Sequence, residues 1–186
     1  MSAEKSIKME NQEKTVEEMS QQERNQRFLD LCAEADQLAA ASGWGDWCGY
    51  NRVRELVSNI FLDLNMPQKY AGPDGIDSEG NGVEHKSTIA EEIKGNYRGL
   101  SYDEDFQVQR EIVEKKILKL PKHYYTRFKR NSTEIEEVWE LDAEKVVDLI
   151  IPKLEKQHPG LRGKRDPRPS ACVTKKEITT FGRKLL

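Results

Sequence analysis

A glycine-containing turn between two short extended segments is the feature that most constrains the fold of this chain. Residues 78–82 read SEGNG, and Gly and Asn are the residues that adopt positive φ at least cost. The turn predicts a hairpin between a short strand at 74–76 and a longer strand that follows it. Side chains alternate between the two faces of a strand, so Glu84 and Lys86 should project together. The hairpin would bring Asp74 beside them.

Two helices are expected before this hairpin, because apolar residues recur at spacings of three and four. The first stripe runs from Phe28 to Ala39, and the second runs from Val53 to Leu64 and stops before Pro67. Both stripes are expected to pack into the core. The intervening GWGDWCG segment lacks the spacing of a dinucleotide-binding loop and is expected to connect the two helices.

The second half of the chain alternates strand and helix signals. An amphipathic helix at 105–120 should cover the sheet, and strands at 123–129 and 134–141 should form a hairpin. Asp142 should cap a further helix that is kinked or broken at Pro152. The expected fold class is therefore α/β (α+β), with a central mixed β-sheet flanked by helices.

The composition favours one globular domain. The chain has 186 residues, of which 36% are hydrophobic and 34% charged, enough for a modest core. Residues 1–20 lack apolar periodicity and are expected to form a flexible polar tail, which leaves 21–186 as a single domain. No apolar run approaches the roughly 20 residues that span a bilayer, so no membrane association is expected. Three widely spaced cysteines argue against disulfides or a zinc site and favour a cytoplasmic location.

The charge distribution leaves nucleic-acid binding open. The formal net charge is −3, but residues 160–186 contain eight Lys or Arg against two acidic residues. A local basic face can coexist with an acidic total.

The predicted trio of Asp74, Glu84 and Lys86 suits phosphodiester hydrolysis. Two hard carboxylates can hold Mg²⁺, which neutralises developing charge and activates water. A lysine can orient the attacking water and stabilise the transition state. A Glu-x-Lys pattern alone carries little weight, since it recurs at Glu92 and Glu114. The competing interpretation is a solvated hairpin on which Glu84 and Lys86 form a weak surface ion pair.

At these residues the sequence resembles the PvuII family of restriction endonucleases, within the PD-(D/E)xK superfamily. Asp74, Gly80, the Glu84-x-Lys86-Ser87 motif and the downstream Lys94-Gly95 pair keep the family's spacing. The resemblance implies a type II site-specific deoxyribonuclease that uses Mg²⁺ to cut a short symmetric duplex site and leaves 5′-phosphate ends. It implies that Asp74 and Glu84 bind the metal and that Lys86 supplies the catalytic amine.

The resemblance also implies a homodimer formed through the N-terminal helices, a catalytic core at 70–130, and a recognition loop and strand at 160–182. The restriction interpretation would give the protein a partner, a cognate DNA methyltransferase acting on the same site. The family's base-reading histidines are replaced here, so the recognition sequence should differ. Base-reading loops are expected at 97–105 and 162–170. The candidate DNA-binding residues are Asn51, Lys94, Tyr97, Arg98, Asp103, Arg165, Asp166 and Arg168.

Three alternatives stay open. A repair, recombination or phage nuclease could use the same core on a structured DNA substrate. A non-catalytic DNA-binding module is a second alternative, although a purely binding surface has no use for two acids facing phosphate. A helical interaction protein is the third.

Overall fold

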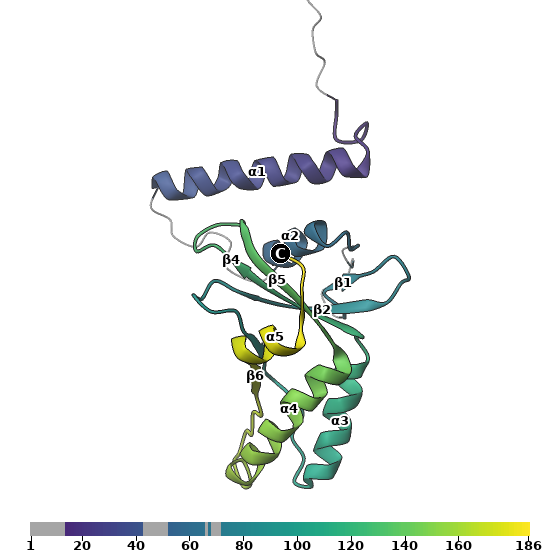
Figure 1. Cartoon of the computed structure of the whole chain (residues 1–186), viewed down its shortest axis with the longest axis vertical. Coiled ribbons are helices and arrows are strands. Elements are labelled where there is room, and N and C mark those ends of the chain that lie inside the picture. The colour runs from purple at the N-terminus through teal and green to yellow at the C-terminus, as the bar shows by residue number, and fades with distance from the viewer. Residues whose placement is uncertain (1–13, 43–51, 66, 68–71) are drawn as a thin grey trace, which may run out of the picture.

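The computed structural model describes residues 14–42, 52–65, 67 and 72–186. Within these residues the chain forms an α/β fold of five helices, a mixed five-stranded sheet and a separate two-stranded sheet (Figure 1). The glycine-rich segment 43–49 and Asn51 lie outside the described residues. The expected fold class is confirmed at this level.

The five-stranded sheet is built around one parallel pair of strands. Its order is β1 (Gly75–Ile76), β2 (Gly82–Thr88), β4 (Lys122–Phe128), β5 (Ile135–Asp142) and β7 (Arg183–Lys184). Strands β2 and β4 are parallel, and the other neighbours are antiparallel. Both predicted hairpins, β1–β2 and β4–β5, are present. In the first turn, the Asp77 carboxylate accepts hydrogen bonds from the backbone N–H groups of Glu79 and Asn81, and Gly80 has φ +87°.

The connection between the parallel strands carries β3 (Gly95–Tyr97) and α3 (Phe106–Leu118). Parallel neighbours require a crossover of this kind, because no tight turn can join them. Helix α3 begins where the Asp105 carboxylate accepts a hydrogen bond from Gln107 N, which satisfies one free donor of the first turn. Strand β3 pairs with β6 (Ala171–Val173) in the small sheet.

Helix α4 (Ala143–Gln157) packs against α3, and the two helices lie side by side at one end of the molecule (Figure 1). Of the expected kink or break at Pro152, the break is wrong, since the helix continues through this residue and is followed by a 3₁₀ turn at His158–Gly160. Pro152 is exposed, whereas Ile151 and Leu154 beside it are buried. Burial of that apolar stripe offsets the lost backbone hydrogen bond.

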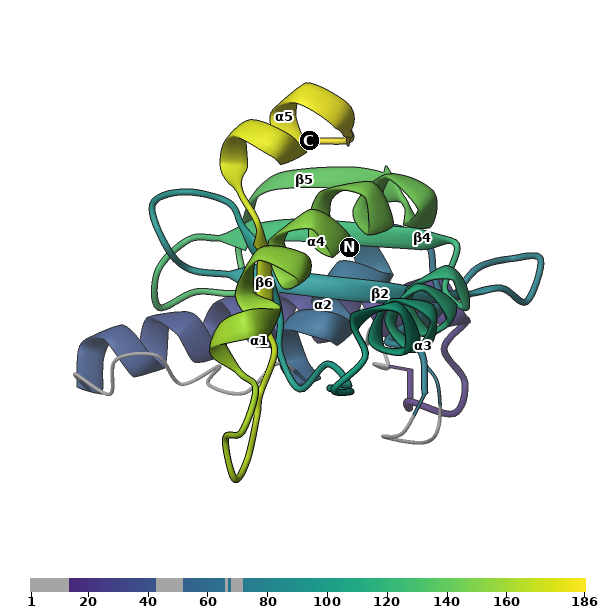
Figure 2. The same cartoon turned by 90° about the horizontal axis from the view of Figure 1, so that it is seen from below.

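A short helix, α5 (Lys175–Phe181), follows β6 and packs on β5 (Figure 2). It was not expected from the sequence. A capping box starts it: Thr174 Oγ1 accepts from Glu177 N, and the Glu177 carboxylate accepts from Thr174 N. The chain then enters β7 at the edge of the main sheet.

The N-terminal helices differ in how they are buried. In α2 (Arg52–Phe61), Val57 is 3% exposed, as expected for a core helix. In α1 (Gln21–Ser42), Cys32 is buried but Leu31 and Leu38 are 47% and 57% exposed. The prediction that the whole first stripe packs into the core is therefore wrong. Helix α1 lies at the end of the molecule opposite α3 and α4 (Figure 1). Its Asp36 carboxylate links it to the β4–β5 turn by accepting hydrogen bonds at 3.2 Å from Thr133 N and Thr133 Oγ1.

The main core lies between the sheet and the layer formed by α3 and α4. Its fully buried members include Ile93, Val113, Tyr125, Val146 and Ile150. None of the helices in the described ranges is long and apolar enough to cross a membrane.

Candidate functional site

The predicted trio comes together at the edge of this core. Glu84 and Lys86 are half-buried on one face of β2, where their side chains form an ion pair, while Val83 and His85 point to the opposite face and are buried. Asp74 precedes β1, and its backbone N–H donates to Val83 O at 2.9 Å. The turn-bridged hairpin therefore places Asp74 beside the strand that carries the other two residues.

A buried amide holds Asp74 in place. Asn59 of α2 donates from Nδ2 to the Asp74 carbonyl at 2.9 Å, and its Oδ1 lies 2.7 Å from His85 Nε2. The backbone N–H of His85 donates to Asp74 Oδ2 at 2.8 Å. Gly75 makes this approach feasible, because a Cβ at that position would lie 2.3 Å from Asn59 Oδ1. The hairpin thus places Asp74 at the site, and Asn59 of α2 fixes its position.

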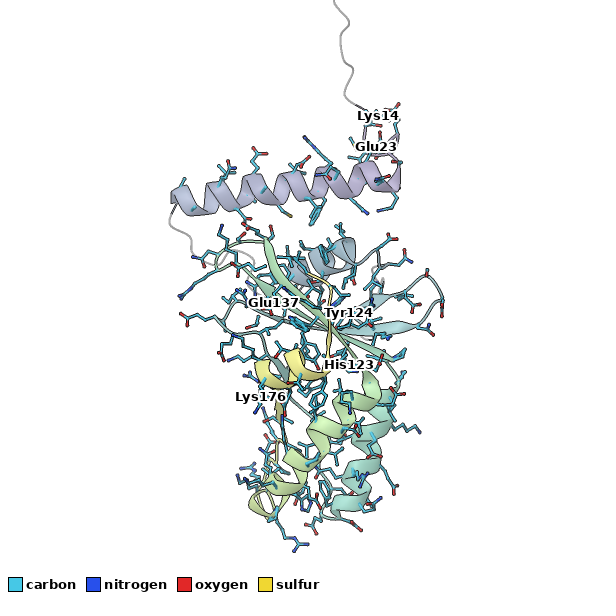
Figure 3. The ribbon with its side chains drawn as sticks, viewed as in Figure 1. Lys14, Glu23, His123, Tyr124, Glu137 and Lys176 are labelled. Carbon is cyan, nitrogen blue, oxygen red and sulfur yellow. The ribbon has the colours of Figure 1, made fainter. Side chains whose placement is uncertain are left out.

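A hydrogen-bonded group of rings forms the floor of the site. The parallel register pairs Glu84 with His123 and Lys86 with Tyr125, so these four side chains share a face. The Tyr97 hydroxyl lies 2.7 Å from His123 Nδ1 and 2.8 Å from the Tyr125 hydroxyl. The Lys86 ammonium sits 4.8 Å from the centroid of the Tyr97 ring, within range of a cation–π attraction. His123 lies inside the molecule, where β4 meets the helical layer (Figure 3).

The electrostatics of the site distinguish its carboxylates from its rings. Burial raises the pKa of Asp74 to about 6, and the neighbouring Glu84 carboxylate adds to the rise. Burial lowers the pKa of His123 and raises that of Tyr97 far above its ordinary value. Both rings are therefore neutral near pH 7, and the charge of the site resides in its carboxylates and lysines.

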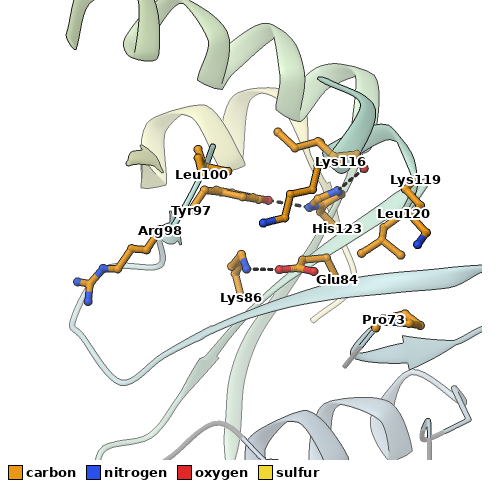
Figure 4. Close-up of a pocket in the computed structure, with 12 residues that line it drawn as sticks. Pro73, Glu84, Lys86, Tyr97, Arg98, Leu100, Lys116, Lys119, Leu120 and His123 are labelled. Carbon is orange, nitrogen blue, oxygen red and sulfur yellow. Dashed lines mark hydrogen bonds and ion pairs between the residues drawn. The ribbon is translucent and has the colours of Figure 1, made fainter. Parts of the chain in front are cut away.

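A cavity of about 320 Å³ opens over this floor (Figure 4). Glu84, Lys86 and His123 line it from the sheet, and Lys116 reaches into it from α3. Its apolar wall comes from Pro73, Leu100, Ile117 and Leu120. The cavity gives a substrate direct access to the carboxylate and amine groups of β2.

The donor set fits a hard divalent cation. Within the described part of the chain, no cluster of three His, Cys, Asp or Glu side chains has metal-binding geometry. Asp74 and Glu84 instead offer two carboxylates, and their mutual repulsion contributes to the raised pKa of Asp74. A cation between them would relieve that repulsion, and Mg²⁺ commonly binds through one or two carboxylates and several waters.

The structure places the candidate DNA-binding residues in different settings. The β3–β6 pairing, with Tyr97 opposite Ala171, brings the loop at 98–100 beside the loop at 167–170. Arg98 and Lys94 are exposed near the site. Arg165, Asp166 and Arg168 are also exposed, and they lie on the segment that precedes β6. Asp166 and Arg168 form an ion pair with each other.

Two candidates have roles within the fold. Tyr97 is 5% exposed and its hydroxyl is held by His123 and Tyr125, so it forms the site floor and does not project outward as a base contact would. The Asp103 carboxylate accepts a hydrogen bond from Asp105 N, next to the start of α3.

Sequence reasoning missed Asn59, His123, Tyr125 and Lys116. Alternation along β4 would have placed His123 and Tyr125 on one face, but nothing local indicates that β4 lies parallel to β2. Asn59 lies within the apolar stripe of a helix predicted to be purely structural.

Comparisons with known proteins give no identification: no protein-family model matches the chain, and no curated protein matches it.

The raised pKa of Asp74 predicts that Asp74→Asn stabilises the metal-free fold at alkaline pH. A carboxyl whose pKa rises from 3.8 to about 6 on folding lowers stability as pH increases through that interval, because the folded state then retains more protons than the unfolded state. The shift corresponds to about 3 kcal/mol, which we reduce to about 1–2 kcal/mol because the group is partly exposed.

Thermal unfolding in EDTA should therefore give the Asp74→Asn variant a higher Tm than the wild type at pH 8, with a smaller gain at pH 5. A gain that does not change with pH, or a loss at pH 8, would contradict the assignment of this pKa.

Proposed function

We propose that the protein is a Mg²⁺-dependent DNA endonuclease with a PD-(D/E)xK-type core, and more specifically a type II restriction endonuclease. The observation that carries the proposal is the convergence of Asp74, Glu84 and Lys86 beside an accessible cavity, which Glu84 and Lys86 line. The mixed sheet with its parallel β2–β4 pair is compatible with such a core.

In this proposal each residue of the trio has a defined task. Asp74 and Glu84 would hold Mg²⁺, which supplies a Lewis acid for the phosphate and lowers the pKa of a bound water. Lys86 donates hydrogen bonds from Nζ to the attacking water and to a phosphate oxygen, which orients the one and stabilises charge on the other. The Tyr97 ring below Lys86 orients the ammonium through a cation–π contact.

Incubation with a long bacteriophage DNA tests the proposal. Discrete fragments with Mg²⁺, and intact DNA in EDTA, are expected for a restriction endonuclease. A smear would support nuclease activity but contradict site-specific restriction. DNA that stays intact with Mg²⁺ would contradict the proposed nuclease activity.

We further propose a homodimer, which cutting both strands of a symmetric site requires. Leu31 and Leu38 lie two turns apart on α1 and are about half exposed, which leaves apolar surface for a second copy. Sedimentation equilibrium at micromolar concentration should give twice the chain mass of 21.5 kDa. Leu31→Glu with Leu38→Glu should shift the species towards the monomer, and a wild-type monomer would contradict the proposal.

A further inference from the structure

Two hollows flank Lys86, one on either side. The first is the cavity described above, between β2 and α3, which Lys116 and Lys119 line. The second, of about 300 Å³, lies between β2 and β3, and its lining includes Ser87, Lys94 and Asn96. Lys86 and Arg98 line both, so the hollows adjoin at these side chains and together outline a path past the proposed catalytic amine.

Apart from Lys86, the cations that line this path have no acidic partner among the described residues. Lys94, Arg98, Lys116 and Lys119 form no ion pair with any described residue. Some lysines elsewhere are paired, such as Lys122 with Glu140 and Asp142, and Lys153 with Glu177, so what distinguishes these four cations is that they line the two hollows beside Lys86. Together with Lys86, the four cations outnumber the two carboxylates of the site. Cations gathered along one path raise the local positive potential, which attracts an anion.

We propose that this path is a phosphodiester track, along which one DNA strand crosses the site. Lys116 and Lys119 bind phosphates on the α3 side of the scissile group, and Lys94 binds a phosphate on the β3 side. The Asn96 amide supplies a neutral donor beside Lys94, and Arg98 lies where the two halves meet. The proposal deepens the function proposed above, because it rests on a DNA substrate and assigns backbone contacts to residues outside the catalytic trio.

The neighbouring residue of α3 provides a matched control. Lys115 precedes Lys116 on the same exposed helical turn but does not line the cavity. Both lysines have the same charge and helix propensity, so a difference between Lys115→Gln and Lys116→Gln reports the direction of the side chain. Because Lys119 lines the same hollow, Lys116→Gln with Lys119→Gln removes the α3 half of the track.

The test is DNA binding by metal-free protein, measured by fluorescence anisotropy of a labelled duplex in EDTA over a range of NaCl concentrations. Each phosphate contact contributes about 0.9 to the slope of log K against log salt concentration. Lys94→Gln should therefore reduce the slope by about one, and the Lys116/Lys119 double variant by about two. Lys115→Gln should keep the wild-type slope, and all variants should keep the wild-type Tm.

A slope in the double variant equal to that of Lys115→Gln would overturn the track, as would wild-type protein without affinity for DNA. Since no metal is present, the result is separate from catalysis. Reduced slopes together with DNA that stays intact in Mg²⁺ would support the track and contradict the nuclease.

Discussion

Lys86→Ala is expected to lower the cleavage rate by roughly 10²–10³-fold, or about 3–4 kcal/mol at the transition state, the loss typical of removing a group aimed at developing charge. Lys86 faces the cavity beside Glu84 and above Tyr97. Among the described residues, Lys116 also reaches into the cavity, but from the opposite wall. Single-turnover cleavage of a mapped fragment with saturating enzyme measures the chemical step apart from binding.

Lys129→Ala is the appropriate control. Lys129 pairs with Glu134 beside the β4–β5 turn, far along the sheet from the cavity, so its loss should leave the cleavage rate unchanged. Lys86→Ala removes a cation that lowers the pKa of Asp74, and the folded protein should therefore lose a little stability at neutral pH. Cleavage by the Lys86→Ala protein at the wild-type rate would remove Lys86 from the mechanism.

Gly95→Ala is expected to destabilise the fold by more than about 3 kcal/mol, in the upper range for overpacking a core. A Cβ on Gly95 would lie 2.2 Å from Tyr125 Cε1 and 2.7 Å from its Cδ1. Tyr125 cannot move aside easily, because it is fully buried and its hydroxyl bonds to Tyr97. Separation of β3 from β4 would also displace the Tyr97 ring from Lys86, so residual folded protein should cleave poorly.

Urea unfolding followed by tryptophan fluorescence measures this loss. Gly160→Ala is the matched control: no atom lies within 4 Å of the added Cβ, and the backbone there does not have positive φ. That variant should match the wild type or slightly exceed it, because alanine reduces the entropy of the unfolded chain. Equal midpoints for the two variants would show that the β3–β4 contact is looser than the structure indicates.

Local signals were sufficient for most of the secondary structure. The SEGNG turn, the aromatic β4–β5 hairpin and the apolar stripe of α2 each depend on residues close together in the chain, and the structure confirms them. The local signal was misleading at Pro152 and in α1. A proline breaks an isolated helix, but packing of Ile150, Ile151 and Leu154 holds α4 together. The apolar residues of α1 have helical spacing, but spacing alone does not show whether their side chains are buried in the core.

The arrangement of the proposed catalytic trio was predictable because a single turn sets its geometry. Asp74, Glu84 and Lys86 lie on one hairpin, so alternation along β2 and the length of the turn are enough to place them together. Its surroundings were not predictable in the same way. Asn59 comes from α2, His123 and Tyr125 from a parallel strand, and Tyr97 from the small sheet. Each reaches the site through a long-range contact.

The sequence by itself therefore determined which residues are available for the proposed chemistry, because side-chain type and strand periodicity are local properties. Only the tertiary structure decided how those residues are held and which cations flank them. The crossover between β2 and β4 places His123 under Glu84, and the pairing of β3 with β6 joins two loops about 70 residues apart in the sequence. Such pairings depend on the total burial that one global arrangement achieves, and no short segment contains that information.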